Sequence, residues 1–216
     1  MYEIISLGHA CYTKTNINRL FKEQETIFFD WIITDFKSVL YVLQNINNKD
    51  LISSNNFSNQ NIFINRDSWK PECHKIEHKD FKMVSIHDFS SDIPYLDYMD
   101  TFILKYNRRL DRLEKIINSD KNVHMIHSLD NIHTPVYIIT NKDIENFFNY
   151  LNIINPNNKC ILHIVIPPEY SNIDLSHLIQ SNVYVYHLID EHPEWYCWAK
   201  TTYNWNIVFD NIAKIG

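Results

Sequence analysis

Residues 4–22 read IISLGHACYTKTNINRLFK, and this stretch decides the fold class. The apolar run at residues 4–8 stops at a glycine, which is typical of a short buried strand that ends in a turn. Residues 12–22 can follow as a helix, so the chain begins with a strand, a turn and a helix. Cys11 then lies in the turn between the two elements.

The alternation of short strands and longer helices continues along the chain. Apolar runs predict four further strands, at residues 81–87, 123–127, 160–166 and 183–189. Apolar residues three and four apart predict a long helix over residues 96–117. Shorter helices are predicted after Asp35, after the capping-box pair Thr140 and Asp143, at residues 174–180 and around residues 205–212. Residues 45–61 are polar and without periodicity, so we expect a surface loop there.

This order of elements predicts the architecture. Strands that alternate with helices imply right-handed crossovers and a mainly parallel sheet. We therefore expect a single three-layer α/β domain over residues 1–216, with about five strands and helices on both faces. Ligand sites of open α/β sheets lie at the carboxyl ends of the strands. Cys11, His87 and His127 each lie at or just beyond such an end, so we expect them to converge on one cleft.

Composition and charge exclude several classes of function. A formal charge of −6 argues against a protein that binds nucleic acid over a broad surface. The chain has two glycines, Gly8 and Gly216, whereas phosphate-binding loops need several in a short stretch, and we expect no nucleotide cofactor. No secretory signal or membrane span is recognisable, so we expect a cytoplasmic protein whose four cysteines are thiols.

Cys11 carries the most distinctive chemistry. A cysteine at a helix N-terminus is expected to have a lowered pKa, because the helix dipole favours the thiolate. Such a nucleophile needs a histidine as base, and His87 is the best-placed candidate. Asp30 or Asp88 could hold that imidazole in one tautomer, and the direction of a continuing strand favours Asp30. Backbone amides near residues 8–10 would bind an oxyanion.

Four short motifs stand in the first half of the chain. They are Ser6-Leu7-Gly8 followed by Cys11, then Phe29-Asp30-Trp31, then His87-Asp88-Phe89, then Arg108-Arg109 with Arg112. In this order they resemble the putative papain-like cysteine peptidase family, a domain family of unknown function. The resemblance implies a thiol nucleophile at Cys11 with His87 as its partner. The chain departs from the family pattern at Phe28, Leu113 and His127, where the family has proline, phenylalanine and arginine.

The predicted fold differs from that of papain itself. Papain places its cysteine on a long central helix packed against a β-barrel domain, whereas the order strand, cysteine, helix predicts a parallel sheet here.

Certain esterase-like hydrolases carry a nucleophile after the first strand and an Asp-x-x-His near the C-terminus. The chain has Asp190 and His192, one residue short of that spacing, so His192 with Asp190 is an alternative to His87.

The three arginines of the last motif allow two interpretations. Arg108 and Arg112 share a helix face with Asp111 and Lys115 nearby, which is typical of a solvated, ion-paired surface. Guanidinium groups also suit carboxylate and phosphate, so Arg108, Arg109 and Arg112 are candidate ligands for a sugar phosphate or an acidic glycan. His127, where the family has arginine, would bind such an anion only when protonated.

These observations leave more than one function open. The first hypothesis is a thiol-dependent hydrolase or acyl-transfer enzyme acting on a peptide, small-molecule or glycan substrate. The others are a non-catalytic domain that binds an anionic sugar or phosphate ligand, and an accessory to glycan synthesis. Cys73, His74 and His78 could bind zinc, but no second ligand pair with zinc-finger spacing follows, so we expect no metal.

Overall fold

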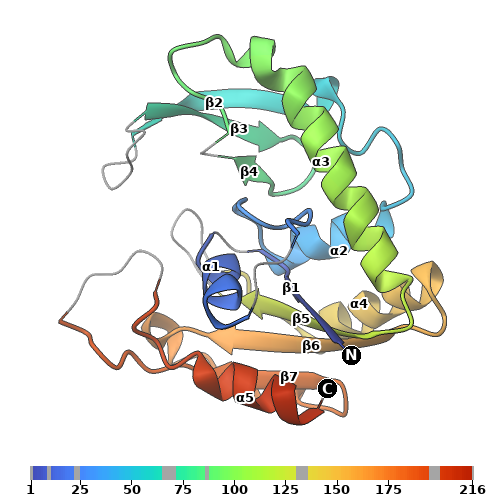
Figure 1. The fold of residues 1–216 in the computed structure, drawn as a ribbon, viewed down its shortest axis with the longest axis vertical. Coiled ribbons are helices and arrows are strands. Elements are labelled where there is room, and N and C mark those ends of the chain that lie inside the picture. The colour runs from blue at the N-terminus through green and yellow to red at the C-terminus, as the bar shows by residue number, and fades with distance from the viewer. Residues whose placement is uncertain are drawn as a thin grey trace.

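A parallel sheet of four strands forms the centre of the molecule in a computed structural model (Figure 1). The model describes residues 2–8, 11–21, 25–64, 72–85, 88–129, 136–194 and 200–215. The strands are β1 (Tyr2–Ser6), β5 (Asn122–Ser128), β6 (Lys159–Ile166) and β7 (Val183–His187), in that spatial order. All neighbouring pairs run parallel, so their carboxyl ends meet at one edge of the sheet.

A second, antiparallel sheet contains β2 (Phe57–Ile64), β3 (Glu72–His78) and β4 (Val84–Ser85). Two expectations were wrong here. Strand β4 belongs to this sheet, which leaves four parallel strands instead of about five. Residues 57–61 of the expected surface loop form part of β2, because pairing with β3 satisfies the backbone hydrogen bonds of a polar strand without local periodicity.

Five α-helices complete the described part of the chain. They are α1 (Cys11–Leu20), α2 (Phe36–Gln44), α3 (Tyr95–Ile117), α4 (Asn141–Ile154) and α5 (Asn206–Ile215). Short 3₁₀ helices occupy η1 (Ser54–Asn56), η2 (Pro168–Tyr170) and η3 (Ser176–Leu178). The predicted caps are confirmed: Asp35 accepts a hydrogen bond from the Ser38 amide, and Thr140 with Asp143 forms a capping box before α4.

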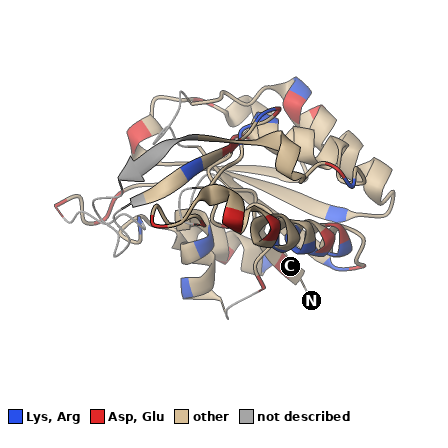
Figure 2. Cartoon of the chain, turned by 90° about the horizontal axis from the view of Figure 1, so that it is seen from above, with Lys and Arg blue, Asp and Glu red and all other residues tan. Residues whose placement is uncertain are grey.

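The helices cover both faces of the parallel sheet, which confirms the predicted α/β class (Figure 1). On one face, Tyr12 and Ile17 of α1 and Phe209 of α5 pack against Ile126 of β5 and Val165 of β6. On the other face, α2, α3 and α4 share a larger core that continues to the antiparallel sheet. Basic and acidic residues are interspersed over the helices (Figure 2). None of the helices in the described ranges has the length and apolarity that a membrane span requires.

Candidate functional site

Cys11 is the first residue of α1 and follows the carboxyl end of β1. The Leu7 amide still donates to the Ile126 carbonyl of β5, at 2.8 Å, and the chain then turns at Gly8. Gly8 has a φ of +85°, and a Cβ at this position would lie 2.2 Å from Thr34 Cγ2. Only glycine therefore fits the turn that leads from the sheet edge to Cys11.

The thiol of Cys11 is protonated at neutral pH in this structure. Burial raises the pKa of Cys11 to about 11, and the hydrogen bond to its own backbone lowers it by less. The expectation that the helix N-terminus lowers the pKa of Cys11 was wrong. Removing the thiolate from water destabilises it more than the helix dipole stabilises it. A reaction at Cys11 would need a base that takes the proton as the sulfur attacks.

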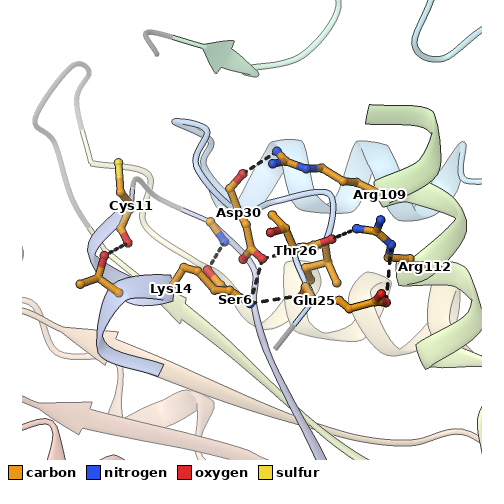
Figure 3. A network of polar contacts seen from close by, with 11 residues as sticks. Ser6, Cys11, Lys14, Glu25, Thr26, Asp30, Arg109 and Arg112 are labelled. Carbon is orange, nitrogen blue, oxygen red and sulfur yellow. Dashed lines mark hydrogen bonds and ion pairs between the residues drawn. The ribbon is translucent and has the colours of Figure 1, made fainter. Parts of the chain in front are cut away.

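Asp30 is completely buried beside α1 (Figure 3). Its Oδ2 accepts from the Ile27 amide at 2.9 Å and lies 3.1 Å from Nζ of Lys14, which is also buried. Oδ1 is buried and has no hydrogen-bond partner within the described ranges. Burial raises the pKa of Asp30, and Lys14 opposes that rise. The next residue, Trp31, has a φ of +68°, an uncommon conformation for a large side chain.

Two of the three predicted arginines hold the turn of residues 25–30 (Figure 3). Arg109 is buried, donates to the Asp30 carbonyl at 3.2 Å and lies 4.7 Å from the centre of the Tyr106 ring. Arg112 donates to the Thr26 carbonyl at 2.5 Å. Arg108 is exposed. The ion pair of Arg112 with Glu25 agrees with the ion-paired face expected for Arg108 and Arg112, whereas anion binding by the three arginines stays a prediction.

Asp88 is held by residues from the middle of helix α3, one turn before Arg109. Its Oδ2 accepts hydrogen bonds from Ser85 Oγ at 2.7 Å and from the Tyr106 hydroxyl at 3.1 Å, and Lys105 forms an ion pair with Oδ1. Tyr106 thus contacts Asp88 through its hydroxyl and Arg109 through its ring. His87, the predicted base, lies outside the described residues.

Four segments that are distant in sequence are therefore joined in one network. Lys14 of α1 pairs with Asp30, Arg109 of α3 binds the backbone of Asp30, and Tyr106 connects Arg109 to Asp88. Each of the four sequence motifs either contributes a member or lies directly beside one. Arg109 of the arginine motif holds the segment of Asp30 in place, whereas Tyr106, which lies outside the motifs, holds Asp88.

His127 lies on β5 and contacts the chain where β1 ends. The residue is buried, its Nδ1 donates to the Leu7 carbonyl at 3.4 Å, and its ring packs edge-on against Phe36. Burial lowers the pKa of His127 to about 4. The imidazole is therefore neutral near pH 7, and binding of an anion by His127 stays a prediction that would require a lower pH.

The alternative pair, Asp190 and His192, has a different geometry from a catalytic dyad. Asp190 Oδ1 accepts from the backbone amide of His192 at 3.1 Å, while the His192 ring lies 3.4 Å from Glu194 Oε1. Asp190 therefore fixes the backbone and not the imidazole. Proton transfer between His192 and Cys11 stays a prediction.

A second polar group next to α1 was not predicted from the sequence. Lys200 Nζ lies 3.1 Å from Glu169 Oε1 and 4.8 Å from the centre of the Tyr12 ring, and Tyr203 donates to Glu169 at 2.6 Å. Tyr12 in turn donates to Ser128 Oγ at 2.8 Å, at the end of β5. These contacts hold Tyr12, the residue after Cys11, against the parallel sheet. Lys14 was also missed, although it follows Cys11 by one helical turn.

The residues considered for zinc are used in other contacts. His78 Nε2 donates to the Leu51 carbonyl at 2.9 Å, and His74 Nε2 donates to the Ile93 carbonyl at 3.2 Å. Within the ranges that the structure describes, no three histidine, cysteine or carboxylate side chains are grouped as metal ligands.

A comparison with models of protein families finds a match to this chain. The family model described as "Putative papain-like cysteine peptidase (DUF1796)" matches residues 2–161, which include all four motifs. Neither the curated proteins nor the solved structures contain a match to the chain. The matched region runs from β1 into the first residues of β6 and covers well over half of the sequence. The chain therefore belongs to the putative papain-like cysteine peptidase family.

Proposed function

We propose that this protein is a thiol-dependent hydrolase or acyl-transfer enzyme with Cys11 as its nucleophile. One observation carries the proposal: Asp30, Arg109 and Asp88, from three of the four motifs, are joined in one network, and Lys14 connects that network to the helix that Cys11 begins. The position of Cys11 beyond the carboxyl end of a parallel strand agrees with where α/β enzymes hold their reacting groups.

The protonated thiol dictates the order of events. The sulfur would form its bond to the carbonyl carbon of a substrate as its proton passes to the imidazole of His87. The tetrahedral intermediate would then expel the leaving group, which takes that proton, and leave a thioester on Cys11. Water or another acceptor would cleave the thioester and restore the thiol. Oδ1 of Asp30, which has no partner in the described ranges, is the oxygen we propose for orienting the base.

The test measures turnover and thiol reactivity separately. Turnover is assayed on a panel of activated esters, thioesters and peptide amides, and alkylation of Cys11 by iodoacetamide is followed by peptide mapping. We expect Cys11→Ala to abolish turnover and His87→Ala to lower it by roughly 100-fold or more. His192→Ala should leave turnover unchanged. Cys160→Ala is the matched control, since Cys160 is a buried thiol on β6 whose pKa is raised to about 12.

Full activity in Cys11→Ala would reject the nucleophile. Loss of activity in His192→Ala instead of His87→Ala would replace the base and favour the esterase-like arrangement with Asp190.

A second candidate function is non-catalytic binding of an anionic sugar or phosphate ligand. The raised pKa of Cys11 favours it, because a resting thiol is a weak nucleophile. Arg108 is the exposed arginine of the motif and would make the first contact. A nucleotide-sugar or a sugar phosphate that raises the melting temperature in wild type, and not in Arg108→Met, would support binding.

A further inference from the structure

Lys14 makes contacts that are unusual for a lysine. Its side chain is 3% exposed, although lysine is among the residues least often buried. Nζ lies 3.1 Å from Asp30 Oδ2 and donates to the Glu25 carbonyl at 3.3 Å. A buried ammonium group is costly unless it is paired, so this position requires Asp30.

The contacts of Lys14 connect two parts of the site. The turn of residues 25–30 is held on α3 by Arg109 and Arg112. Lys14 attaches α1 to that turn, three residues after Cys11 (Figure 3). Tyr12 attaches the same helical turn to β5 through Ser128. The backbone at Cys11 is thus held from two sides, by the sheet and by the turn.

We propose that Lys14 is a positioning residue, whose ion pair with Asp30 fixes the first turn of α1 against residues 25–30 and so holds the Cys11 thiol in its partly buried place. The consequence for catalysis rests on the function proposed above, but the consequence for the thiol does not. Releasing the pair should expose the sulfur, which would bring the pKa of Cys11 down from about 11 toward the ordinary value. The charged groups around the pair are Glu25, Arg109 and Arg112.

The experiment compares Lys14→Met, Asp30→Asn, the double variant and Lys14→Arg. Lys14→Met leaves Asp30 without its ammonium partner and can fail to fold, whereas the double variant leaves neither charge of the pair. We expect the folded double variant to be alkylated by iodoacetamide at Cys11 at least about tenfold faster than wild type near pH 7.5, with a lower pH midpoint. Lys14→Arg should retain the wild-type profile. Lys142→Met, which removes an exposed ion pair on α4, is the control.

A double variant that is folded by circular dichroism and keeps the wild-type rate and midpoint would overturn the proposal, because the pair would then only stabilise the fold. If the double variant does not fold, Asp30→Asn decides in the same way, since it keeps the shape of the side chain and removes the ion pair. If the proposed function is right, turnover should fall in the variants whose alkylation accelerates. Absent turnover in wild type would reject the enzyme and leave the alkylation result valid.

Discussion

Two buried polar networks of this protein differ in charge. The first joins Lys14, Asp30 and Arg109 and contains two cations and one carboxylate. The second lies between the parallel sheet and α5 and contains groups that are neutral near pH 7. In it His124 Nδ1 lies 2.9 Å from His163 Nε2, and His163 Nδ1 lies 3.0 Å from the hydroxyl of Tyr186, which donates to Asn211 Oδ1 at 3.0 Å.

Hydrogen-bond direction fixes the protons of the neutral network. Because Tyr186 donates to Asn211, its oxygen must accept from Nδ1–H of His163. His163 Nε2 is then the acceptor for Nδ1–H of His124. The remaining atom, His124 Nε2, is a buried acceptor with no hydrogen-bond partner among the residues that the structure covers. Burial lowers the pKa of both imidazoles, that of His163 to about 3.

The difference in charge corresponds to the kind of backbone that each network joins. The neutral network joins regular elements, three strands and a helix, and needs no charge. The charged network joins a turn to two helices, and the long side chains of Lys14 and Arg109 reach the backbone carbonyls that the turn leaves unpaired. Charge is thus used where the backbone is irregular and where Cys11 has to be positioned.

Acid should change the free energy of unfolding most, with opposite signs for the buried histidines and for Asp30. His127 and His163 have lowered pKa values when folded, so their stabilising contribution is present above about pH 6.5 and is lost as the pH falls. Between pH 7 and pH 5 we expect each to cost about 2 kcal/mol of unfolding free energy. Urea denaturation at both pH values measures the total loss of unfolding free energy. His163→Phe should reduce that loss by about 2 kcal/mol, the contribution of one histidine.

Asp30 should act in the other direction. Its folded pKa is raised, so its contribution is most favourable at low pH and is lost as the pH rises through that pKa. Asp30→Asn should therefore steepen the loss of stability as the pH falls toward 4. An acid loss that is identical in wild type, His163→Phe and Asp30→Asn would show that neither network dominates the titration.

The next effect separates adjacent arginines of one motif. Arg109→Met removes the donor to the Asp30 carbonyl and the contact with the Tyr106 ring, and should lower the unfolding free energy by about 2–4 kcal/mol. Arg108→Met should leave it nearly unchanged, because Arg108 is exposed. Urea denaturation of the two variants makes the comparison. Equal losses of unfolding free energy in the two variants would contradict the stabilising contacts assigned to Arg109.

The smallest effect tests the neutral network. Tyr186→Phe removes the acceptor for His163 and the donor to Asn211, and should cost about 1–2 kcal/mol. Tyr184→Phe is the matched control, since the Tyr184 ring stacks on His163 at 5.5 Å without a hydrogen bond to it. Thermal unfolding measures both. Two variants of equal stability would mean that stacking, and not the hydrogen-bond chain, holds the imidazole.

Local signals in the sequence were enough for the helices. The spacing of apolar residues predicted α3, and capping residues predicted the starts of α2 and α4, because these features depend on neighbours within one or two turns. Strand β2 was missed, because its polar sequence forms a strand through pairing with β3, which begins eight residues after β2 ends.

The candidate site, like the fold, was predicted from the sequence only in part. The motifs predicted which segments matter, and Asp30 and Arg109 do meet in the structure. The partner of Asp30 could not be predicted, because Lys14 reaches it only when α1 packs beside the turn of residues 25–30.

By itself the sequence determined the alternation of the parallel strands with helices, the glycine turn that leads to Cys11 and the resemblance to the family. Those properties follow from local geometry and from residue identity. Tertiary structure alone decided the protonation states of Cys11 and His127, the buried pairing of Lys14 with Asp30 and the direction of the histidine chain. The reason is that a pKa or an ion pair inside a protein depends on how much water is excluded and on which groups replace it, and packing sets both.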